Sequence, residues 1–414
     1  MSLALVALLL LVAILVLAAV RSDLNAGVFA VAVAYGLGLW VMGLSAAEVA
    51  AFLPSQLVLT IVGVALLFEM AHQNGTLERL TALMIRLVRG NTRLLPMSFF
   101  LLTFALSAMG PGNIAATALV APVAMPTAVA AGLSPFLMAV LVCTGANAGA
   151  FSPVSVTGNI NATLIQKIGL TDPLLPLQIF VIVALIQSVT AVAAYWLLGG
   201  YRFKRSPQLP ETPPPRFERR HLLTLAAVGV FILALVAFRA PAPAVAFALI
   251  ACLSLLRIAD ADASIKALPW GVLLLISGLS ILIGLLEEVG SLELTTRLLA
   301  QAATPQTLNA TLAFFAGLAS VGSSSSGVVM PLFIPLAPQI LERLGGGDLA
   351  AAVMAIDLGS HMVDVSPLST LGALCLAALP SGVNRSRLFR NLLLWGLAMT
   401  FVAALLAWVF LDLI

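Results

Sequence analysis

Charge is scarce in this sequence. Lys, Arg, Asp and Glu together make up 9% of its 414 residues, whereas hydrophobic residues make up 61%. A soluble protein of this length has no interior large enough to hide so much apolar surface. The composition therefore excludes a water-soluble globular protein and predicts an all-α polytopic membrane protein that lies in a lipid bilayer.

Several common sources of chemistry are also absent. The three cysteines, Cys143, Cys252 and Cys375, fall in apolar segments without metal-ligand spacing, so we expect them to pack rather than to form a disulfide framework. The chain has no P-loop, HExxH or GxSxG motif, which leaves ATP-driven transport and intramembrane hydrolysis without support. We therefore expect no enzyme, no organic cofactor and no nucleic-acid partner, and the only bound metal that we consider is a coupling Na⁺.

Apolar windows of about 20 residues, each long enough to cross a bilayer, predict ten membrane spans. They lie near residues 2–20, 26–43, 53–72, 134–165, 174–197, 221–238, 241–257, 268–287, 349–380 and 387–411. The first run lacks a basic segment before it and is too long for a signal peptide, so we interpret it as a retained span, with a cleaved signal as the alternative.

Two further apolar stretches, 94–131 and 308–342, are interrupted at their midpoints. The interruptions read "GPGN" (Gly110 to Asn113) and "GSSSSG" (Gly322 to Gly327). Such stretches are typical of hairpins that turn inside the membrane, although two full crossings would fit the same pattern.

The basic residues set the expected orientation, because cytoplasmic loops carry an excess of Lys and Arg. With the N-terminus outside, sixteen of the 20 Lys and Arg residues fall on one side of the membrane. This split predicts a bacterial-type inner membrane protein with both termini outside. The segment 199–220, which contains five prolines and clustered basic residues, is expected to be a cytoplasmic linker.

The two halves that this linker joins resemble each other. "FSPVSVTGN" (Phe151 to Asn159) matches "VSPLSTLGA" (Val365 to Ala373) at a shift of 214, and "GTLERLT" (Gly75 to Thr81) matches "GSLELTT" (Gly290 to Thr296) at a shift of 215. Matches in one order at nearly one shift indicate duplication. Because each half has five spans, an odd number, the second copy must be inverted, which is typical of secondary transporters.

The hairpin tips and the breaks at 151–159 and 365–373 carry the candidate binding groups. Broken helices expose N–H groups suited to an anion and carbonyl groups suited to a cation, and hydroxyl and amide groups add further ligands. For the substrate we select Gly112, Asn113, Thr157, Asn159, Ser325, Ser326, Ser369 and Thr370. For the coupling cation we select Ser152, Ser155, Gly158, Ser366, Gly372, Asp357, His361 and Asp364. The alternative is that these residues serve helix packing.

Three of the cation candidates are ionisable and lie close together. Asp357, His361 and Asp364 are spaced by four and three residues, which predicts one helical face just before the second break. Intramembrane charges normally mark a transport pathway, so this group is expected to carry a proton or to bind Na⁺. The alternative is that its members pair with one another. The first half has Cys143, Asn147 and Ala150 at the matching positions, so the two halves should not be equivalent.

These features resemble the ion transporter superfamily, in particular the divalent-anion/sodium symporter group and its dicarboxylate carriers of the MatC (malonate carrier) type. The resemblance rests on "SAMGPGNIAATALVAPVAM" (Ser107 to Met125), "GLSPFLMAVLVCTGANAGAFSPVSVTGN" (Gly132 to Asn159), "GSSSSGVVMPLFIPL" (Gly322 to Leu336) and "VSPLSTLGA". Symporters of the group have a Ser-Asn-Thr motif at each hairpin tip. Here only Asn113, Ser325 and Ser326 can be carried over, which puts a two-sodium arrangement in doubt.

The resemblance implies a homodimer and an elevator mechanism. It divides the first repeat (1–198) into scaffold helices (1–92) and a transport part (93–198), and the second (221–414) into 221–306 and 307–414. The amphipathic segments Thr76 to Arg89 and Leu292 to Ala303 would be arms between these bodies.

We therefore expect an ion-coupled secondary transporter of small organic anions, such as C3 or C4 dicarboxylates, driven by Na⁺ or H⁺. The alternatives are an oxyanion or arsenite-type permease of the same superfamily, an anion channel, and a membrane-embedded enzyme.

Overall fold

The computed structural model describes residues 3–20, 24–53, 55–87, 93–202, 216–238, 240–268, 270–380 and 382–412. Every regular element within these ranges is a helix, which confirms the all-α prediction.

The helices follow the predicted spans closely. The first half contains α1 (Leu3–Val20), α2 (Ala26–Gly36) with its π-helical continuation η1 (Leu37–Val41), α3 (Ala46–Ala51), α4 (Ser55–Gln73), α5 (Thr76–Leu87), α6 (Leu95–Met109), α7 (Gly112–Ala130), α8 (Pro135–Ala150), α9 (Val156–Lys167), α10 (Leu175–Leu197) and the short η2 (Gly200–Arg202). Among these, the short α3 was not predicted. Most of the expected linker, residues 203–215, lies outside the described residues.

The second half repeats this order. It contains α11 (Arg219–Phe238), α12 (Ala242–Leu255), α13 (Ala261–Ala267), α14 (Trp270–Glu288), α15 (Ser291–Ala302), α16 (Leu308–Ser320), η3 (Ser325–Val329), α17 (Met330–Phe333), η4 (Ile334–Leu336), α18 (Ala337–Arg343), α19 (Leu349–Met362), α20 (Thr370–Ala377), α21 (Arg385–Ala407) and η5 (Trp408–Asp412). Here the short α13 was not predicted.

The helices include several that are long and apolar enough to cross a membrane. Within the described ranges these are α7, α10 and α21 with its continuation to Asp412, and α16 with Ser325–Arg343 forms a pair bent by 117°, which fits either a broken span or a re-entrant loop. This sharp bend lies at the interruption predicted for the 308–342 stretch. The finding agrees with a multi-pass membrane protein, while the ten crossings and their orientation stay predictions.

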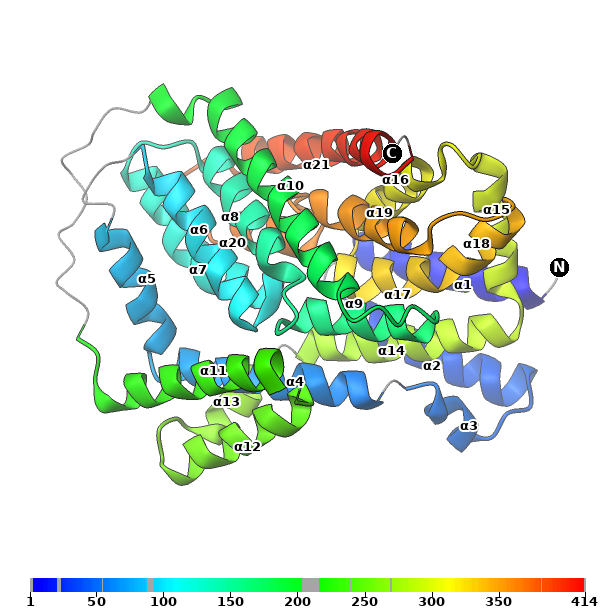
Figure 1. Ribbon diagram of the computed structural model, residues 1–414, viewed down its shortest axis with the longest axis horizontal. Coiled ribbons are helices and arrows are strands. Elements are labelled where there is room, and N and C mark those ends of the chain that lie inside the picture. Colours follow the sequence, from blue (N-terminus) through cyan, green and yellow to red (C-terminus); the bar gives the residue numbers. More distant parts are fainter. Residues whose placement is uncertain are drawn as a thin grey trace.

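The helices form two layers (Figure 1). Helices α4 and α11 to α14 run along the lower edge of the view, and α6 to α10 with α19 to α21 lie above them. The predicted arms are both helices that connect the layers: α5 follows α4 and precedes α6, and α15 follows α14 and precedes α16. They stand at opposite ends of the molecule.

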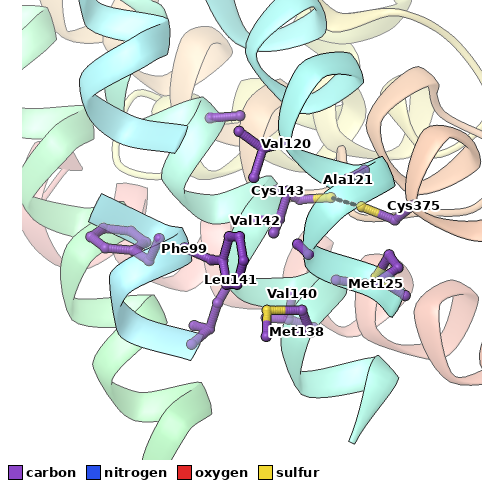
Figure 2. Packing of buried hydrophobic residues seen from close by; sticks show 14 of the residues in the cluster. Phe99, Val120, Ala121, Met125, Met138, Val140, Leu141, Val142, Cys143 and Cys375 are labelled. Atoms are coloured by element: carbon purple, nitrogen blue, oxygen red, sulfur yellow. Dashed lines mark hydrogen bonds between the residues drawn. The ribbon is translucent and has the colours of Figure 1, made fainter. Parts of the chain in front are cut away.

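The upper layer has a tightly packed interior around α8. Every residue of α8 from Leu137 to Ala150 is buried, and its glycines allow close contact with α6: a Cβ on Gly145 would lie 2.4 Å from the Phe100 carbonyl oxygen. Figure 2 shows part of this cluster, with Cys143 on α8 facing Cys375 on α20 and their Sγ atoms 3.7 Å apart. Cys143 and Cys375 are free and buried, as predicted for packing residues, whereas Cys252 on α12 is free but exposed, so the packing prediction is wrong for it.

Some close contacts between helices occur twice, once in each half of the chain, at positions separated by about the shift that relates the two halves. A Cβ on Gly63 of α4 would lie 3.2 Å from Ala246 on α12, and a Cβ on Gly278 of α14 would lie 2.1 Å from the Gly27 carbonyl oxygen on α2. The two glycines that make these contacts, Gly63 and Gly278, are 215 positions apart. Small residues at such crossings let membrane helices approach closely.

Candidate functional site

The first break in the upper layer is a sharp turn between α8 and α9. Ser155 is the N-cap of α9, where its Oγ accepts a hydrogen bond from the Gly158 N–H at 3.0 Å and donates to the Ala150 carbonyl. A Cβ on Gly158 would lie 2.0 Å from the Ser152 carbonyl oxygen. The turn therefore requires a hydroxyl at 155 to cap the helix and a glycine at 158 to fold back against it.

The second break, between α19 and α20, has the same backbone contact. A Cβ on Gly372 would lie 2.2 Å from the carbonyl oxygen of Ser366, which is the counterpart of Ser152. Ser369 occupies the N-cap position of α20, yet its side chain makes no capping bond. Its Oγ donates instead to Asp364 Oδ1 at 2.9 Å. The two breaks thus share a backbone shape and differ in what the capping serine does.

The hairpin tips bring two further helix starts to the same region. At the first tip, Gly110 (φ 152°) and Gly112 (φ 78°) adopt backbone conformations that favour glycine, and α7 begins at Gly112. At the second tip, Ser324 caps η3 by accepting a hydrogen bond from the Gly327 N–H at 3.1 Å. Both turns therefore rest on residues that the interruptions "GPGN" and "GSSSSG" supply.

A chamber of about 410 Å³ lies between the two layers and brings the tips and the first break together. Four of the eight predicted substrate residues line it: Gly112, Asn113, Thr157 and Ser326. They form a polar floor, to which both hairpin tips and the first break contribute. None of the described residues that line the chamber is Lys or Arg.

Asn113 is the central polar group of this floor. Its Oδ1 accepts hydrogen bonds from the Ile114 N–H at 3.0 Å and from Thr157 Oγ1 at 3.3 Å, while its Nδ2 donates to Asn147 Oδ1 at 2.8 Å. An amide has two N–H donors, so a second one remains for a ligand.

Asn147 connects this floor to the second half of the chain. It is fully buried on α8, and its Nδ2 donates to the His361 carbonyl at 2.7 Å near the end of α19. A carbonyl in the last turn of a helix lacks an intrahelical partner, so the Asn147 amide satisfies it. Asn147 and His361 are 214 positions apart, the shift that relates the two breaks.

Asp364 lies at the second hairpin tip, where its carboxyl group accepts hydrogen bonds from several serine hydroxyl groups. Its Oδ1 accepts hydrogen bonds from Ser325 at 2.5 Å, Ser369 at 2.9 Å and Ser320 at 3.3 Å, and the carboxyl group is buried. A narrow gap beside it, too small for a water molecule, is bordered by Asn113, Ser324, Ser325, Ser326, Asp364 and Thr370, among others. Asn113 and Ser326 also line the large chamber, so the Asp364 cluster lies next to the polar floor.

The other two ionisable candidates face different partners. Asp357 Oδ2 accepts a hydrogen bond from Asn161 Nδ2 at 2.6 Å, and its Oδ1 is buried without a partner. The His361 ring packs edge-on against Phe151, with 4.5 Å between ring centroids, and its Nε2 is also buried without a partner. The three residues therefore do not pair with one another through their side chains.

Three further predicted residues, Asn159, Ser366 and Ser152, take part in the turns themselves. Asn159 Nδ2 donates to the Ser155 carbonyl at 2.7 Å, and Ser366 Oγ donates to the Val321 carbonyl at 2.7 Å. Ser152 supplies the carbonyl against which Gly158 packs. None of these three side chains is among the described residues that line the chamber.

Sequence reasoning did not select three residues of this network: Asn147, Asn161 and Ser320. Asn147 and Asn161 carried a usable signal, because an amide inside an apolar membrane segment needs a hydrogen-bond partner. Ser320 carried none, since a serine can satisfy its hydroxyl within its own helix.

Within the described residues, no group of three His, Cys, Asp or Glu side chains could hold a metal ion. A Na⁺ at the second tip would therefore bind to one carboxylate, Asp364, and to neutral oxygens, which suits a hard monovalent cation.

The chamber is also lined by Glu69, His72 and Gln73 of α4. His72 Nδ1 lies 3.4 Å from Glu69 Oε1, and His72 Nε2 lies 2.9 Å from Glu78 Oε1 on α5. His72 and Glu78 are about half exposed, as expected for residues at the end of a span.

Comparison with known proteins bears on this geometry. Residues 1–150 match the family described as the dicarboxylate carrier protein MatC N-terminus, so this part of the chain is similar to that family. The match confirms the MatC-type resemblance over a region that includes the first hairpin, Asn113 and Asn147. It is a match to a transporter family and not to an enzyme family. A comparison of the chain with curated proteins finds no match.

Proposed function

We propose that this protein, whose first 150 residues are similar to the MatC dicarboxylate carrier family, is an ion-coupled secondary transporter of small organic anions such as C3 or C4 dicarboxylates. One observation carries the proposal: Asn113, Thr157 and Ser326, from two hairpin tips and a helix break, meet at the floor of one chamber. Midplane sites of this kind are typical of secondary transporters.

The floor suits an anion although it lacks basic side chains. Helices α7 and α9 both begin there, at Gly112 and Val156. Helix N-termini carry a partial positive charge, and Ser326 adds a hydroxyl donor, while the Thr157 hydroxyl, which donates to Asn113, would have to turn towards a substrate carboxylate. The carboxylates of the substrate would be held by these groups and by the free N–H of Asn113.

The coupling cation would bind at Asp364. Its carboxylate and the hydroxyls of Ser320, Ser325 and Ser369 form a buried acceptor cluster. Asn113 and Asp364 border the same narrow gap, so a bound cation would lie close to the substrate carboxylates. Because opposite charges attract strongly in a buried site, either ligand would raise the affinity for the other. Ser325 and Ser369 would thus serve the cation rather than the substrate.

The paired contacts support two inverted repeats, 1–198 and 221–414. Gly158 and Gly372 fold against matching carbonyls, and the contacts of Gly63 and Gly278 join matching helices of opposite halves. The arms follow the same rule, since α5 contacts α11 and α15 contacts α1. Each of these contacts in the first half therefore has a counterpart in the second half at nearly the same shift.

The two layers support an elevator mechanism. The lower layer of Figure 1 contains scaffold helices of 1–92 and 221–306, and the upper layer contains the parts assigned to transport, 93–198 and 307–414. The chamber lies between them, and Leu77 of α5 is among its lining residues. We propose that the transport parts move against the scaffold, in a protomer of a homodimer.

Uptake of radiolabelled malonate and succinate into proteoliposomes tests the proposal. We expect uptake to require a Na⁺ or pH gradient. Asn113→Ala and Thr157→Val should each reduce it at least tenfold, because each removes a floor group without filling the chamber. Wild-type uptake kinetics in both variants, with the melting temperature unchanged, would contradict the site assignment.

The nature of the cation is tested by Asp364→Asn. Loss of the pH dependence with the Na⁺ dependence intact would identify a proton, and the opposite result would identify Na⁺. Retention of both dependences would exclude Asp364 as the coupling site.

A further inference from the structure

The chamber above the polar floor is almost entirely apolar. Its walls include Ile61 and Phe68 of α4, Leu119 of α7, Ile160 of α9 and Ile276 of α14. Apart from the floor residues, the polar side chains in the described lining are those of Glu69, His72 and Gln73 on α4. A second carboxylate therefore finds no partner along these walls.

The size of the chamber does not match an unsubstituted substrate. Its volume of about 410 Å³ falls in the range of roughly 300–1,000 Å³ that is usual for pockets binding drug-sized ligands. A C3 or C4 dicarboxylate is much smaller and would engage the floor alone. The space above it would hold water against aliphatic and aromatic side chains, where water finds few hydrogen-bond partners.

We infer that the preferred ligands are dicarboxylates that carry an apolar substituent, an alkyl chain of several carbons or an aryl group, on the carbon chain between the carboxylates. This inference rests on the proposed function. Both carboxylates bind at the floor, near Asn113, Thr157 and Ser326, and the substituent extends into the chamber towards Phe68 and Ile276. The ionisable residues of the lining, Glu69 and His72, favour an opening of the chamber to water rather than to lipid, so a dissolved solute can reach it.

A series of malonates tests this inference in the purified full-length protein. Malonate, methylmalonate, butylmalonate and benzylmalonate differ only in the substituent. Burial of one methylene group strengthens binding about fourfold. We therefore expect the dissociation constant, measured by calorimetry, to fall steadily along the alkyl series and to be lowest for the butyl or benzyl compound.

Filling the chamber provides the matched variant. Ala118 lines the chamber on α7, whereas Ala130, at the end of the same helix, is exposed and is not among the described lining residues. Ala118→Phe should weaken benzylmalonate binding at least tenfold and leave malonate binding unchanged. Ala130→Phe should change neither, and a second filling variant, Ala65→Leu, covers the case in which Ala118→Phe does not fold.

The outcomes separate this inference from the proposed function. If no malonate binds, the proposed function fails. Equal affinities along the series, or binding of benzylmalonate that both filling variants leave intact, would overturn the inference alone. Competition by fatty acids or detergent, but not by malonate, would show that the chamber holds a lipid tail instead and would equally overturn it.

Discussion

Asn147 offers the sharpest test of the polar network, because a single side chain joins the proposed floor to the second half of the protein. In Asn147→Ala two hydrogen bonds are lost, one from Asn113 Nδ2 at 2.8 Å and one to the His361 carbonyl at 2.7 Å. The Asn113 amide lines the chamber, where water can replace its lost partner. The His361 carbonyl is buried and has no such replacement. The expected loss of stability is therefore that of one unsatisfied buried acceptor, about 1–3 kcal/mol.

The effect on binding follows from the freedom that Asn113 gains. Its amide is held by Asn147 on the Nδ2 side and by Ile114 and Thr157 on the Oδ1 side, so without Asn147 the Nδ2 group is less well fixed towards the proposed substrate carboxylate. A hydrogen bond to a charged group contributes about 1.5–3 kcal/mol, so partial loss of it corresponds to an increase in KM of about tenfold. The maximal uptake rate should change much less, since the amide does not take part in the movement between states.

The assay is dicarboxylate uptake into proteoliposomes, with KM and maximal rate measured separately and the melting temperature recorded. Ser107→Ala is the matched control: it removes a buried hydrogen bond of 2.7 Å to the Ala146 carbonyl, next to Asn147 on α8, without touching Asn113. It should lower the melting temperature and leave KM unchanged. A normal KM in Asn147→Ala, or an equal rise in KM in Ser107→Ala, would refute the reasoning.

Three further predictions concern the breaks. Gly158→Ala should lower the free energy of unfolding by about 1–3 kcal/mol, because the new Cβ would lie 2.0 Å from the Ser152 carbonyl oxygen; an unchanged denaturation curve would contradict this. Ser155→Ala should cost about 1 kcal/mol as the loss of a helix cap, whereas Ser369→Ala, which removes no cap, should raise the cation concentration needed for half-maximal uptake. Asp364→Ala should abolish cation dependence and lower the free energy of unfolding by about 1–3 kcal/mol, because the buried hydroxyls of Ser325, Ser369 and Ser320 lose their acceptor; retained cation dependence would contradict the coupling role.

Much of the helical framework could be predicted because lipid imposes one simple rule. A span must be apolar and about 20 residues long, so α1, α10 and α21 are visible as runs of hydrophobic residues. The breaks were equally visible, since Pro153, Gly158 and their counterparts in the second half interrupt such runs. The short helices α3 and α13 were missed because segments of six and seven residues leave no periodic pattern.

The partners of the site residues could not be predicted in the same way. Periodicity places Asp357, His361 and Asp364 on one face of a helix, but it does not say which other helices meet that face. In the structure Asp357 bonds to Asn161 from the first half, whereas Asp364 bonds to Ser320 and Ser325 from the second hairpin. These contacts join residues 39 to 196 positions apart. They depend on how the repeats pack, which one helix alone does not encode.

The two breaks differ at a position that bears on their capping serines. Ala150 and Asp364 occupy matching positions. In the first break Ser155 caps its own helix, and Thr157 lines the chamber. In the second break Ser369 makes no capping bond and donates to the Asp364 carboxylate instead. A cation bound at Asp364, as proposed, would compete with Ser369 for this carboxylate, so the start of α20 would respond to cation binding. Under the proposed function the first break would hold the anion, and the Asn113–Asn147–His361 contacts would connect the two breaks.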